Sequence, residues 1–454
     1  MDQDTIVAIA TAPGAGGIGI IRLSGEQALS IGTAISGTSL QPRHAHFCAF
    51  KDRAGQILDT GICLFFPAPN SFTGEHIVEI QAHGSPVILD LIVKEACALG
   101  ARQAQPGEYS QRAYLNNKID LAQAEAIADL INSTTEQAAL NASRSLQGVF
   151  SRKIDALVSM VTNLRIFVEA AIDFPEEEID FLNNTQVETQ LQDIIDQFDV
   201  LAIEARQGSL LQEGMKLVIA GKPNAGKSSL LNALSGQDTA IVTAIEGTTR
   251  DVLREQIQID GMPLHVVDTA GLRDSDDVIE QEGIRRAWAE IESADRILLV
   301  IDDSATSTID YLSNTLLPLQ DKTSKRDIPL TIVSNKCDLS NREPGVAQQG
   351  ETPVVYVSAK TGAGVDLLKQ HLKACMGYKE SGEGRFSARR RHLHSLERAR
   401  EFLLNGQSQL LHAGAGELLA EDLRLCQQSL GEITGAVSSD ELLGAIFSSF
   451  CIGK

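Results

Sequence analysis

The sequence lacks any uninterrupted apolar run of about 18 residues, and its first residues lack the basic segment of a secretory signal. We therefore expect a cytoplasmic protein. Its seven cysteines are odd in number, scattered and never spaced as Cys-x-x-Cys, which argues against a disulfide framework or a zinc site. Positive charge is scarce, with 39 lysines and arginines against 60 aspartates and glutamates, a net charge of -21. Broad nucleic-acid binding is not expected, and any contact with RNA would need a local basic patch or a basic partner.

The chain has 454 residues, which is too long for a single hydrophobic core, and its patterns divide it into four segments. Residues 1–118 mix strand and helix patterns and predict an α+β domain. Residues 119–212 and 379–454 have helical periodicity, whereas residues 213–378 alternate apolar strands with helix-length segments. We expect a multidomain protein in which an α/β domain with a doubly wound sheet is inserted between two halves of one helical domain.

Three segments near the N-terminus have strand patterns: TIVAIAT (5–11), IGIIRL (18–23) and HIVEIQA (76–82). A helix is expected from Pro86, with Ser85 as its cap, up to Gly100. The first of these strands is followed by the Gly-x-Gly-x-x-Gly spacing of dinucleotide-binding folds, formed by Gly14, Gly16 and Gly19. Because IGIIRL has the pattern of a strand and not of a helix, we expect no dinucleotide site here.

Helical patterns dominate after residue 118. LAQAEAIADLI is followed by STTE, which predicts a capping box formed by Ser133 and Glu136, and then by a long amphipathic run up to Phe174. Pro175 and the acidic residues after it interrupt this run before another helical segment begins. These patterns predict long helices on both sides of the interruption.

Five short apolar segments between residues 215 and 360 predict the strands of the inserted domain: KLVIAG (216–221), LHVVDT (264–269), RILLVID (296–302), LTIVSNK (330–336) and VVYVSAK (354–360). The first is followed directly by the rest of a GKPNAGKS motif (221–228) and then by a helical run. This strand, loop and helix context indicates a phosphate-binding P-loop. Lys227 would contact the β- and γ-phosphates and Ser228 would ligate Mg²⁺.

Base recognition is indicated by NKCD, which directly follows the strand LTIVS and contains Asn335, Lys336 and Asp338. It resembles the guanine-reading motif of GTPases, in which the carboxylate accepts two hydrogen bonds that adenine cannot supply. SAK after VVYV would complete the pocket with Ser358, Ala359 and Lys360. Three motifs in this order, each at the end of a strand, predict a GTP-binding domain.

Two switch elements lie between the P-loop and NKCD. DTAG follows LHVV and supplies Asp268, which would order the magnesium shell, together with Thr269, Ala270 and Gly271. GTTR resembles the first switch, with Thr249 as the second magnesium ligand. Ras-like enzymes place a water-orienting glutamine directly after the second motif, but this chain has Leu272 there. Another group must orient water, and the candidates are nearby acids: Asp274, Asp276, Asp277, Glu280 and Glu282.

Taken together, GKPNAGKSSLLNAL, AIVTAIEGTTRDV, DTAGLR, FTGEHIVEIQAHG and the terminal FCIGK resemble the MnmE (TrmE) family of tRNA uridine modification GTPases over essentially the whole chain. The resemblance implies an N-terminal domain that forms a homodimer and binds 5-formyltetrahydrofolate or a related folate. It also implies potassium-stimulated hydrolysis when G domains dimerise, with K⁺ taking the place of an arginine finger.

The resemblance also implies the roles of individual residues. K⁺ would be held by Asn224, Thr243, Ile245 and Thr248. Glu280 would orient water, although Glu282 stands only two residues away. Folate would be bound by Arg22, Glu79, Lys118 and Lys454. Further GTP contacts would come from Ala225, Gly226, Ser229, Ala244, Glu246 and Gly247.

The implied function is GTP hydrolysis as a conformational switch in a complex that modifies the tRNA wobble uridine at C5. The implied partner is the flavoprotein MnmG (GidA), which would carry the FAD, form a heterotetramer or larger complex and hold most of the tRNA. An Era- or Der-type ribosome-assembly GTPase and a GTP-gated scaffold are the alternatives. The role of Cys451 stays open, and Arg389 to Arg391 fit either a solvated helix start or a docking site.

Overall fold

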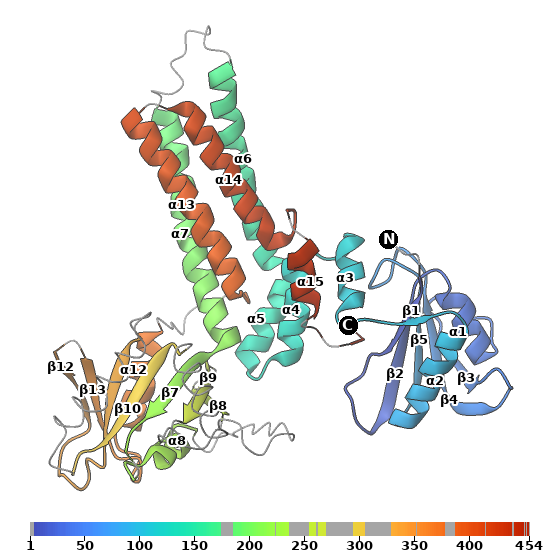
Figure 1. The fold of residues 1–454 in the computed structure, drawn as a ribbon, viewed down its shortest axis with the longest axis horizontal. Coiled ribbons are helices and arrows are strands. Elements are labelled where there is room, and N and C mark those ends of the chain that lie inside the picture. The colour runs from blue at the N-terminus through green and yellow to red at the C-terminus, as the bar shows by residue number, and fades with distance from the viewer. Residues whose placement is uncertain are drawn as a thin grey trace, which may run out of the picture. The chain divides into compact units, whose positions relative to one another are not determined.

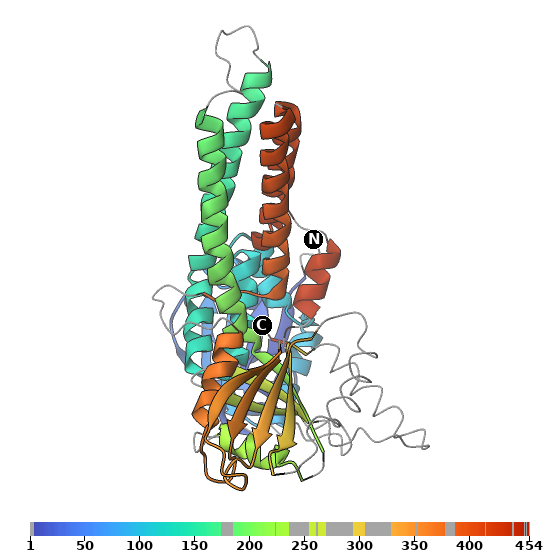
Figure 2. The same ribbon diagram turned by 90° about the vertical axis from the view of Figure 1, so that its left-hand side faces the viewer.

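The computed structural model describes residues 4–173, 185–222, 224–235, 254–259, 262–268, 294–304, 328–350, 352–376, 386–413, 415–437, 440–448, 450 and 452–453. Figures 1 and 2 show the ribbon in two views that differ by a 90° turn. The chain forms two compact units. One contains Met1–Ala128, Ser145–Phe198 and Ser395–Lys454, and the other contains Asp129–Arg144 and Asp199–His394. Within the residues described, no helix is long and apolar enough to cross a membrane.

The N-terminal domain is built on a six-stranded sheet in the order β3-β4-β5-β2-β1-β6. Its strands are β1 (Ile6–Ile9), β2 (Gly16–Ser24), β3 (His46–Lys51), β4 (Ile57–Phe66), β5 (Ile77–Gly84) and β6 (Arg102–Gln103). The inner strands pair antiparallel, whereas β1 and β6 pair in parallel. One face is covered by α1 (Ala28–Ser36) and α2 (Pro86–Ala98), which bury the alternate residues Ile21, Leu23 and Ile80. Arg22 and Glu79 therefore lie on the opposite face.

The three predicted N-terminal strands and the predicted helix are confirmed. Helix α2 begins at Pro86 after an extended Ser85, but the Ser85 side chain makes no capping hydrogen bond. The helix is followed by Gly100, whose positive φ of 111° suits a residue without a Cβ. IGIIRL lies in β2, so the glycine motif before it leads into a strand and not into the helix that a dinucleotide-binding fold requires.

Long helices follow the N-terminal domain and return after the inserted domain. They are α3 (Glu108–Leu115), α4 (Leu121–Asn132), α5 (Glu136–Leu146), α6 (Val149–Asp173), α7 (Thr185–Glu213), α13 (Arg390–Ala413), α14 (Gly416–Thr434) and α15 (Asp440–Ser448). Helices α6 and α14 pack along each other (Figure 1), and Arg165 donates to Gln427 at 2.8 Å between them. Helix α15 packs on α3 and α4, where Leu121, Ala124 and Phe447 form one apolar cluster.

The predicted capping box of α5 is wrong. The Ser133 hydroxyl does not cap α5, because it donates backwards to the Asp129 carbonyl of α4 at 2.7 Å. Thr135 stands directly before α5 instead, and its hydroxyl accepts the Ala138 amide at 3.1 Å. Both residues follow the end of α4, but only Thr135 is close enough to the first turn of α5 to receive that amide.

The inserted domain contains a seven-stranded sheet in the order β12-β13-β11-β10-β7-β9-β8. Its strands are β7 (Met215–Ala220), β8 (Arg254–Ile259), β9 (Met262–Asp268), β10 (Arg296–Asp302), β11 (Leu330–Asn335), β12 (Gly345–Gln349) and β13 (Thr352–Val357). The five predicted strands are confirmed and form the parallel centre. The antiparallel edges β8 and β12 were not predicted, because REQIQI is mostly polar and GVAQQ is too short and too weakly apolar to stand out as a strand.

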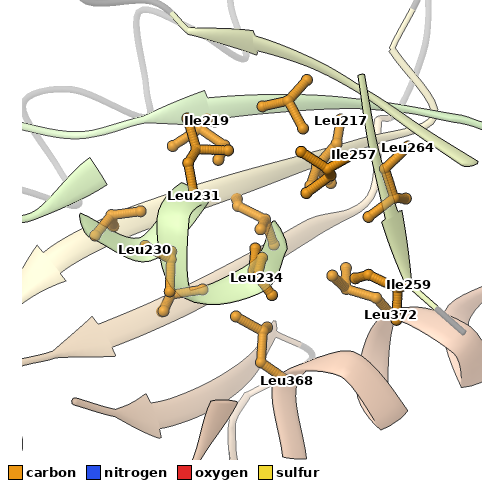
Figure 3. Packing of buried hydrophobic residues seen from close by; sticks show 14 of the residues in the cluster. Leu217, Ile219, Leu230, Leu231, Leu234, Ile257, Ile259, Leu264, Leu368 and Leu372 are labelled. Atoms are coloured by element: carbon orange, nitrogen blue, oxygen red, sulfur yellow. The ribbon is translucent and has the colours of Figure 1, made fainter. Parts of the chain in front are cut away.

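Successive residues of the central strands supply apolar clusters on both faces of this sheet. Leu217 and Ile219 of β7 belong to one cluster, and Val218 belongs to the other. Helices α8 (Lys227–Ser235) and α12 (Val365–Cys375) pack on the first face, where leucines of α8 meet side chains of the sheet and of α12 (Figure 3). This packing fixes the first turn of α8 against the end of β7.

Candidate functional site

The P-loop residues lie between the end of β7 and the first turn of α8, as the sequence predicted. Asn224 has a positive φ of 64° and Gly226 one of 92°. A Cβ atom on Gly226 would lie 2.3 Å from the Asn335 side-chain nitrogen, so only glycine fits there. Ser228 and Ser229 are exposed in the first turn of α8. The free amides of that turn and the helix dipole favour a bound phosphate.

The Lys227 ammonium group lies over the loop that precedes it. It donates to the Gly221 carbonyl at 2.8 Å and to the Lys222 carbonyl at 3.3 Å. These contacts keep the side chain folded back along the loop. The positive charge is therefore held beside the amides that would surround a phosphate.

Asn335 connects two loops of the site from the end of β11. Its side chain is buried, donates to the Ala225 carbonyl at 2.9 Å and accepts the Ala359 amide at 3.0 Å. Ala225 belongs to the P-loop and Ala359 to the SAK loop. One side chain thus ties the phosphate and base regions together.

Lys336 connects the base-reading loop to the P-loop in the same way. Its backbone has a positive φ of 68°, and its ammonium group donates to the Asn224 carbonyl at 2.8 Å. It also pairs with Asp302 at 2.6 Å. Asp302 was missed at the sequence level, although it is the last residue of β10, next to β7 in the sheet.

Asp302 is held as a carboxylate by its neighbours. Partial burial alone would raise its pKa, but hydrogen bonds from Lys336 and Ser304 outweigh burial and lower the pKa below its ordinary value. Its charge therefore fixes the position of Lys336. The signal that could have identified it is a charged residue ending a buried parallel strand, because such ends gather at the ligand-binding edge of a doubly wound sheet.

Asp338 and Lys360 are exposed, while Ser358 is fully buried. Ser358 accepts the Thr361 amide at 3.3 Å, which stabilises the loop after β13. The structure thus brings the P-loop, NKCD and SAK motifs to one edge of the sheet. At the end of β9, Asp268 pairs in register with Ile219 of β7, so its backbone lies at the same edge.

Several predicted residues lie outside the part of the chain that the structure describes. They are Thr243, Ala244, Ile245, Glu246, Gly247, Thr248, Thr249, Thr269, Ala270, Gly271, Asp274, Asp276, Asp277, Glu280, Glu282, Cys451 and Lys454. The side chain of Asp268 is also not described. The first-switch ligands, the candidate water-orienting acids and the terminal lysine therefore stay predictions.

In the N-terminal domain, Arg22 and Glu79 are direct cross-strand partners on β2 and β5. The Arg22 guanidinium donates twice to one oxygen of Glu79, at 3.0 and 2.8 Å. It also lies 5.8 Å from the ring centres of Phe72 and Tyr109. The face of the sheet that α1 and α2 leave uncovered thus carries a cation, an anion and two aromatic rings.

Lys118 reaches the same neighbourhood through the loop before β5. Its ammonium group donates to the Pro69 carbonyl at 2.9 Å, and the adjoining Asn116 donates to the Thr73 carbonyl at 2.7 Å. Phe72, which faces Arg22, belongs to this loop. At the other end of the chain, a Cβ on Gly453 would lie 2.2 Å from the Ile9 carbonyl of β1, so Gly453 contacts the strand beside β2.

A network of charged side chains supports this face, and no sequence motif indicated it. Arg112 of α3 contacts Asp4, Glu75 and Glu108, with N–O distances from 2.7 to 3.1 Å in the three ion pairs. A hydrogen bond from Arg102 is the main cause that lowers the pKa of Asp4. Burial alone would raise the pKa of Glu108, but hydrogen bonds from Arg102, the Gln105 amide and Arg112 outweigh it.

Tyr109 joins that network to Arg22. Its ring is fully buried, and its hydroxyl donates to the Arg22 carbonyl at 2.6 Å. Burial raises the pKa of this phenol, so the hydroxyl stays protonated and remains a donor. The position of Arg22 on β2 is therefore fixed from α3 as well as by strand pairing.

The three arginines from Arg389 to Arg391 do not share one environment. Arg389 contacts the buried Asp129 carboxylate at 2.6 Å, whereas Arg390 is about half exposed and lies 3.5 Å from Asp295. Arg391 contacts the next residue, His392, at 3.0 Å. Arg389 is therefore partly buried against Asp129, and a uniformly solvated helix start does not describe this segment.

Comparison with known proteins finds family matches that together span almost the whole chain. The model of the MnmE helical domain matches residues 121–451, and that of the GTP-binding protein TrmE N-terminus matches residues 5–118. The tRNA modification GTPase MnmE of Marinobacter nauticus is 58% identical over 453 residues, which cover 99% of each chain.

Solved structures give weaker likenesses. The FeoB G domain of Methanococcus jannaschii is 23% identical with a TM-score of 0.26, covering 36% of this chain and 98% of that one. A variant of Aquifex aeolicus Era bound to GDP·AlF4⁻ is 24% identical with a TM-score of 0.25, covering 42% and 67%. TM-scores this low support no inference about this chain.

Proposed function

Because the chain belongs to the MnmE family of tRNA modification GTPases, we propose that it uses GTP hydrolysis to drive C5 aminomethyl-type modification of the tRNA wobble uridine. The observation that carries this proposal is the 58% identity to a tRNA modification GTPase over 99% of both chains. The inserted domain supplies the GTPase activity. We propose that the modification also needs a folate one-carbon donor and a flavoprotein partner.

GTP would be held by the loops that Asn335 and Lys336 tie together. The first-turn amides of α8 and Lys227 would bind the phosphates, and Asp338 would accept hydrogen bonds from guanine. Mg²⁺ would be held by Ser228 and Thr249, and it would neutralise charge on the transferred phosphoryl group. The exposed hydroxyl of Ser228 in the first turn of α8 fits this role.

We propose that K⁺ supplies the positive charge that an arginine finger gives in other GTPases. Asn224 would contribute to its site, with Thr243, Ile245 and Thr248. The exposed position of Asn224 within the P-loop fits a residue whose side chain contributes to a cation site, while its carbonyl is already bound by Lys336. Glu280 would orient the attacking water in place of the glutamine replaced by Leu272.

A folate would be bound on the face of the N-terminal sheet opposite α1 and α2, by Arg22, Glu79, Lys118 and Lys454. The residues present fit such a ligand. A pterin needs a carboxylate partner for its amino and ring nitrogens and an aromatic or apolar wall, while its glutamate tail needs cations. Glu79, Phe72 and Arg22 supply these three features within one contact network.

We further propose that the protein acts in the cytoplasm as a homodimer with an MnmG-type flavoprotein, which carries the FAD and most of the tRNA contacts. The net charge of -21 supports this division, because an acidic chain repels the tRNA backbone unless a partner offsets it. GTP hydrolysis would then act as a conformational switch of the G domains and not as the modification step.

The test is nucleoside analysis of tRNA from a deletion strain that is complemented with the wild-type gene or an empty vector. We expect the modified wobble uridine to disappear without the gene and to return with it. An intact wobble nucleoside in the deletion strain would contradict the proposed function. Steady-state GTP turnover in KCl and NaCl tests the cation proposal separately, and equal rates in the two salts would remove it.

A further inference from the structure

The segment that leaves the G domain is fastened to helix α4 by one buried carboxylate. Asp129 lies near the end of α4, and its side chain is 7% exposed. Arg389 donates to one of its carboxylate oxygens from two nitrogens, at 3.0 and 2.6 Å. Ser387 donates to the other oxygen at 2.6 Å. Each carboxylate oxygen therefore has a donor from the exit segment.

The segment that enters the G domain lies against the same place. Gly208 of α7 is in contact with Phe386, since a Cβ on Gly208 would lie 2.1 Å from the Phe386 carbonyl. Gln212, one turn further along α7, reaches the Asp129 carbonyl at 3.5 Å. The two connections of the inserted domain thus meet beside one residue of α4.

Helix α5 is attached to the same cluster. The Ser387 amide donates to the Asn141 carbonyl of α5 at 3.3 Å, and Ser133 between α4 and α5 donates to the Asp129 carbonyl. The compact unit that contains the G domain correspondingly includes Asp129–Arg144. The boundary of that unit passes through α4 between Ala128 and Asp129, inside a continuous helix.

We propose that Asp129 and Arg389 are positioning residues that make α5 and the end of α4 move with the G domain as one body during the GTP cycle. The latch, defined here as Asp129, Ser387 and Arg389, carries G-domain motion into α4. The other part of α4 packs against α15, the helix that precedes the C-terminal residues. This inference rests on the proposed function, because it assumes that GTP hydrolysis drives the modification reaction.

The contacts between Asp129 and Arg389 depend on both the charge and the shape of the two side chains. Arg389 supplies two donors to one oxygen, which a lysine cannot do from a single nitrogen. An asparagine at position 129 keeps the shape of the side chain but removes the negative charge that the guanidinium contacts. Asp129→Asn and Arg389→Lys are therefore mild tests of the latch, while Asp129→Ala is the severe test and is the more exposed to misfolding.

The first test compares GTP turnover with tRNA modification. We expect Asp129→Asn to leave the KM for GTP within about 2-fold of wild type, because the latch is not part of the nucleotide pocket. Wobble-uridine modification in the complemented deletion strain should fall about 10-fold, with Arg389→Lys intermediate. Arg424→Ala, which breaks an exposed ion pair with Glu421 on α14, is the matched control and should behave as wild type. Normal modification in both latch variants would overturn the proposal.

The second test measures the attachment itself on the full-length protein. Spin labels are placed at Leu140 of α5 and Val346 of β12, both exposed, through a noncanonical amino acid that leaves the cysteines intact. We expect one narrow distance distribution that is the same with GDP and with GDP–aluminium fluoride. It should broaden in Asp129→Asn. A wild-type distance that changes with nucleotide, or a variant distribution as narrow as wild type, would each overturn the latch.

The two tests distinguish a failure of the proposed function from a failure of the latch. If wild-type complementation restores no modified nucleoside, the function is wrong, while the Leu140–Val346 distribution still decides whether the latch holds α5 to the G domain. If modification is normal and Asp129→Asn changes neither modification nor the distance, only the latch is wrong.

Discussion

Three key side chains of the G-domain site donate to backbone carbonyls, whereas Arg22 of the N-terminal domain is held by a charged side chain. Lys227, Lys336 and Asn335 donate to carbonyl groups of the P-loop. Arg22 donates to Glu79, and Arg112 pairs with three carboxylates. Backbone anchors are set by the path of the chain, but side-chain anchors depend on the protonation and identity of their partners. The activity of the GTP site should therefore be abolished by substituting a single catalytic residue. The N-terminal site should be most sensitive to substitutions in the charged network that supports it.

The largest expected effect is at the P-loop. Lys227→Ala removes the cation that contacts the phosphates, and we expect GTP turnover to fall about 10³-fold. Phosphate release at saturating GTP and Mg²⁺ measures this. Lys94→Ala is the control, because Lys94 pairs with Asp90 on the exposed side of α2, in a different domain. Turnover above a tenth of wild type would contradict the assigned role.

The next effect is expected in the N-terminal network. Arg112→Ala leaves Asp4, Glu75 and Glu108 with one cation fewer, and we expect the N-terminal domain to lose about 3 kcal/mol at neutral pH. Urea titrations that follow amide exchange in β1 and α3 measure this. A loss confined to the G domain would contradict the comparison.

The same network should make stability depend on pH. The pKa values of Asp4 and Glu108 are lowered by folding, so the stability that these carboxylates contribute is present above their ordinary values of 3.8 and 4.5. It should be lost as pH falls below those values. The difference between wild type and Arg112→Ala should therefore shrink in acid, and an equal difference at pH 7 and at about pH 3 would refute this reasoning.

A smaller effect is expected for base recognition. Asp338→Asn should raise the KM for GTP about 10²-fold, because an amide cannot accept both guanine hydrogen bonds, and should improve the use of xanthosine triphosphate. Competition between the two nucleotides measures the exchange of preference. An unaltered preference would mean that another residue reads the base.

The smallest effect is expected for the candidate folate site. Arg22→Ala should weaken 5-formyltetrahydrofolate binding about 10-fold, since one charged partner is lost while the other contacts remain. Calorimetric titration of the full-length protein measures this, and GTP turnover should not change. Lys94→Ala, which breaks only an exposed ion pair with Asp90 in the same domain, is the control. Unchanged affinity in Arg22→Ala would retire the assignment.

The same contrast explains what the sequence could predict. P-loop, NKCD and SAK residues were found because each motif is contiguous and ends an apolar strand. Asp302 was missed because its contact with Lys336 depends on the order of β10, β7 and β11 in the sheet. Strand β8 was missed because only Ile257 and Ile259 on one of its faces are apolar, and β12 was missed because it is short and almost entirely exposed.

The N-terminal site was less predictable. Arg22 and Glu79 are 57 residues apart, and their pairing follows from the register of β2 against β5. They were singled out only through resemblance to the family. Tyr109 and Arg112 could not be singled out from the sequence. A tyrosine and an arginine on a short helix are equally compatible with an ordinary exposed helix and with a buried network. Asp129 and Arg389, 260 residues apart, were separated by the whole inserted domain.

The contact between Gly208 and Phe386 has a consequence for the history and the engineering of this chain. A domain whose entering and leaving segments touch can be inserted or deleted without distorting the domain that carries it. Replacing the residues between them by a few flexible ones should leave the helical host folded. A G domain from another GTPase, grafted at the same two positions, would couple a different rate of GTP hydrolysis to the same helical domain.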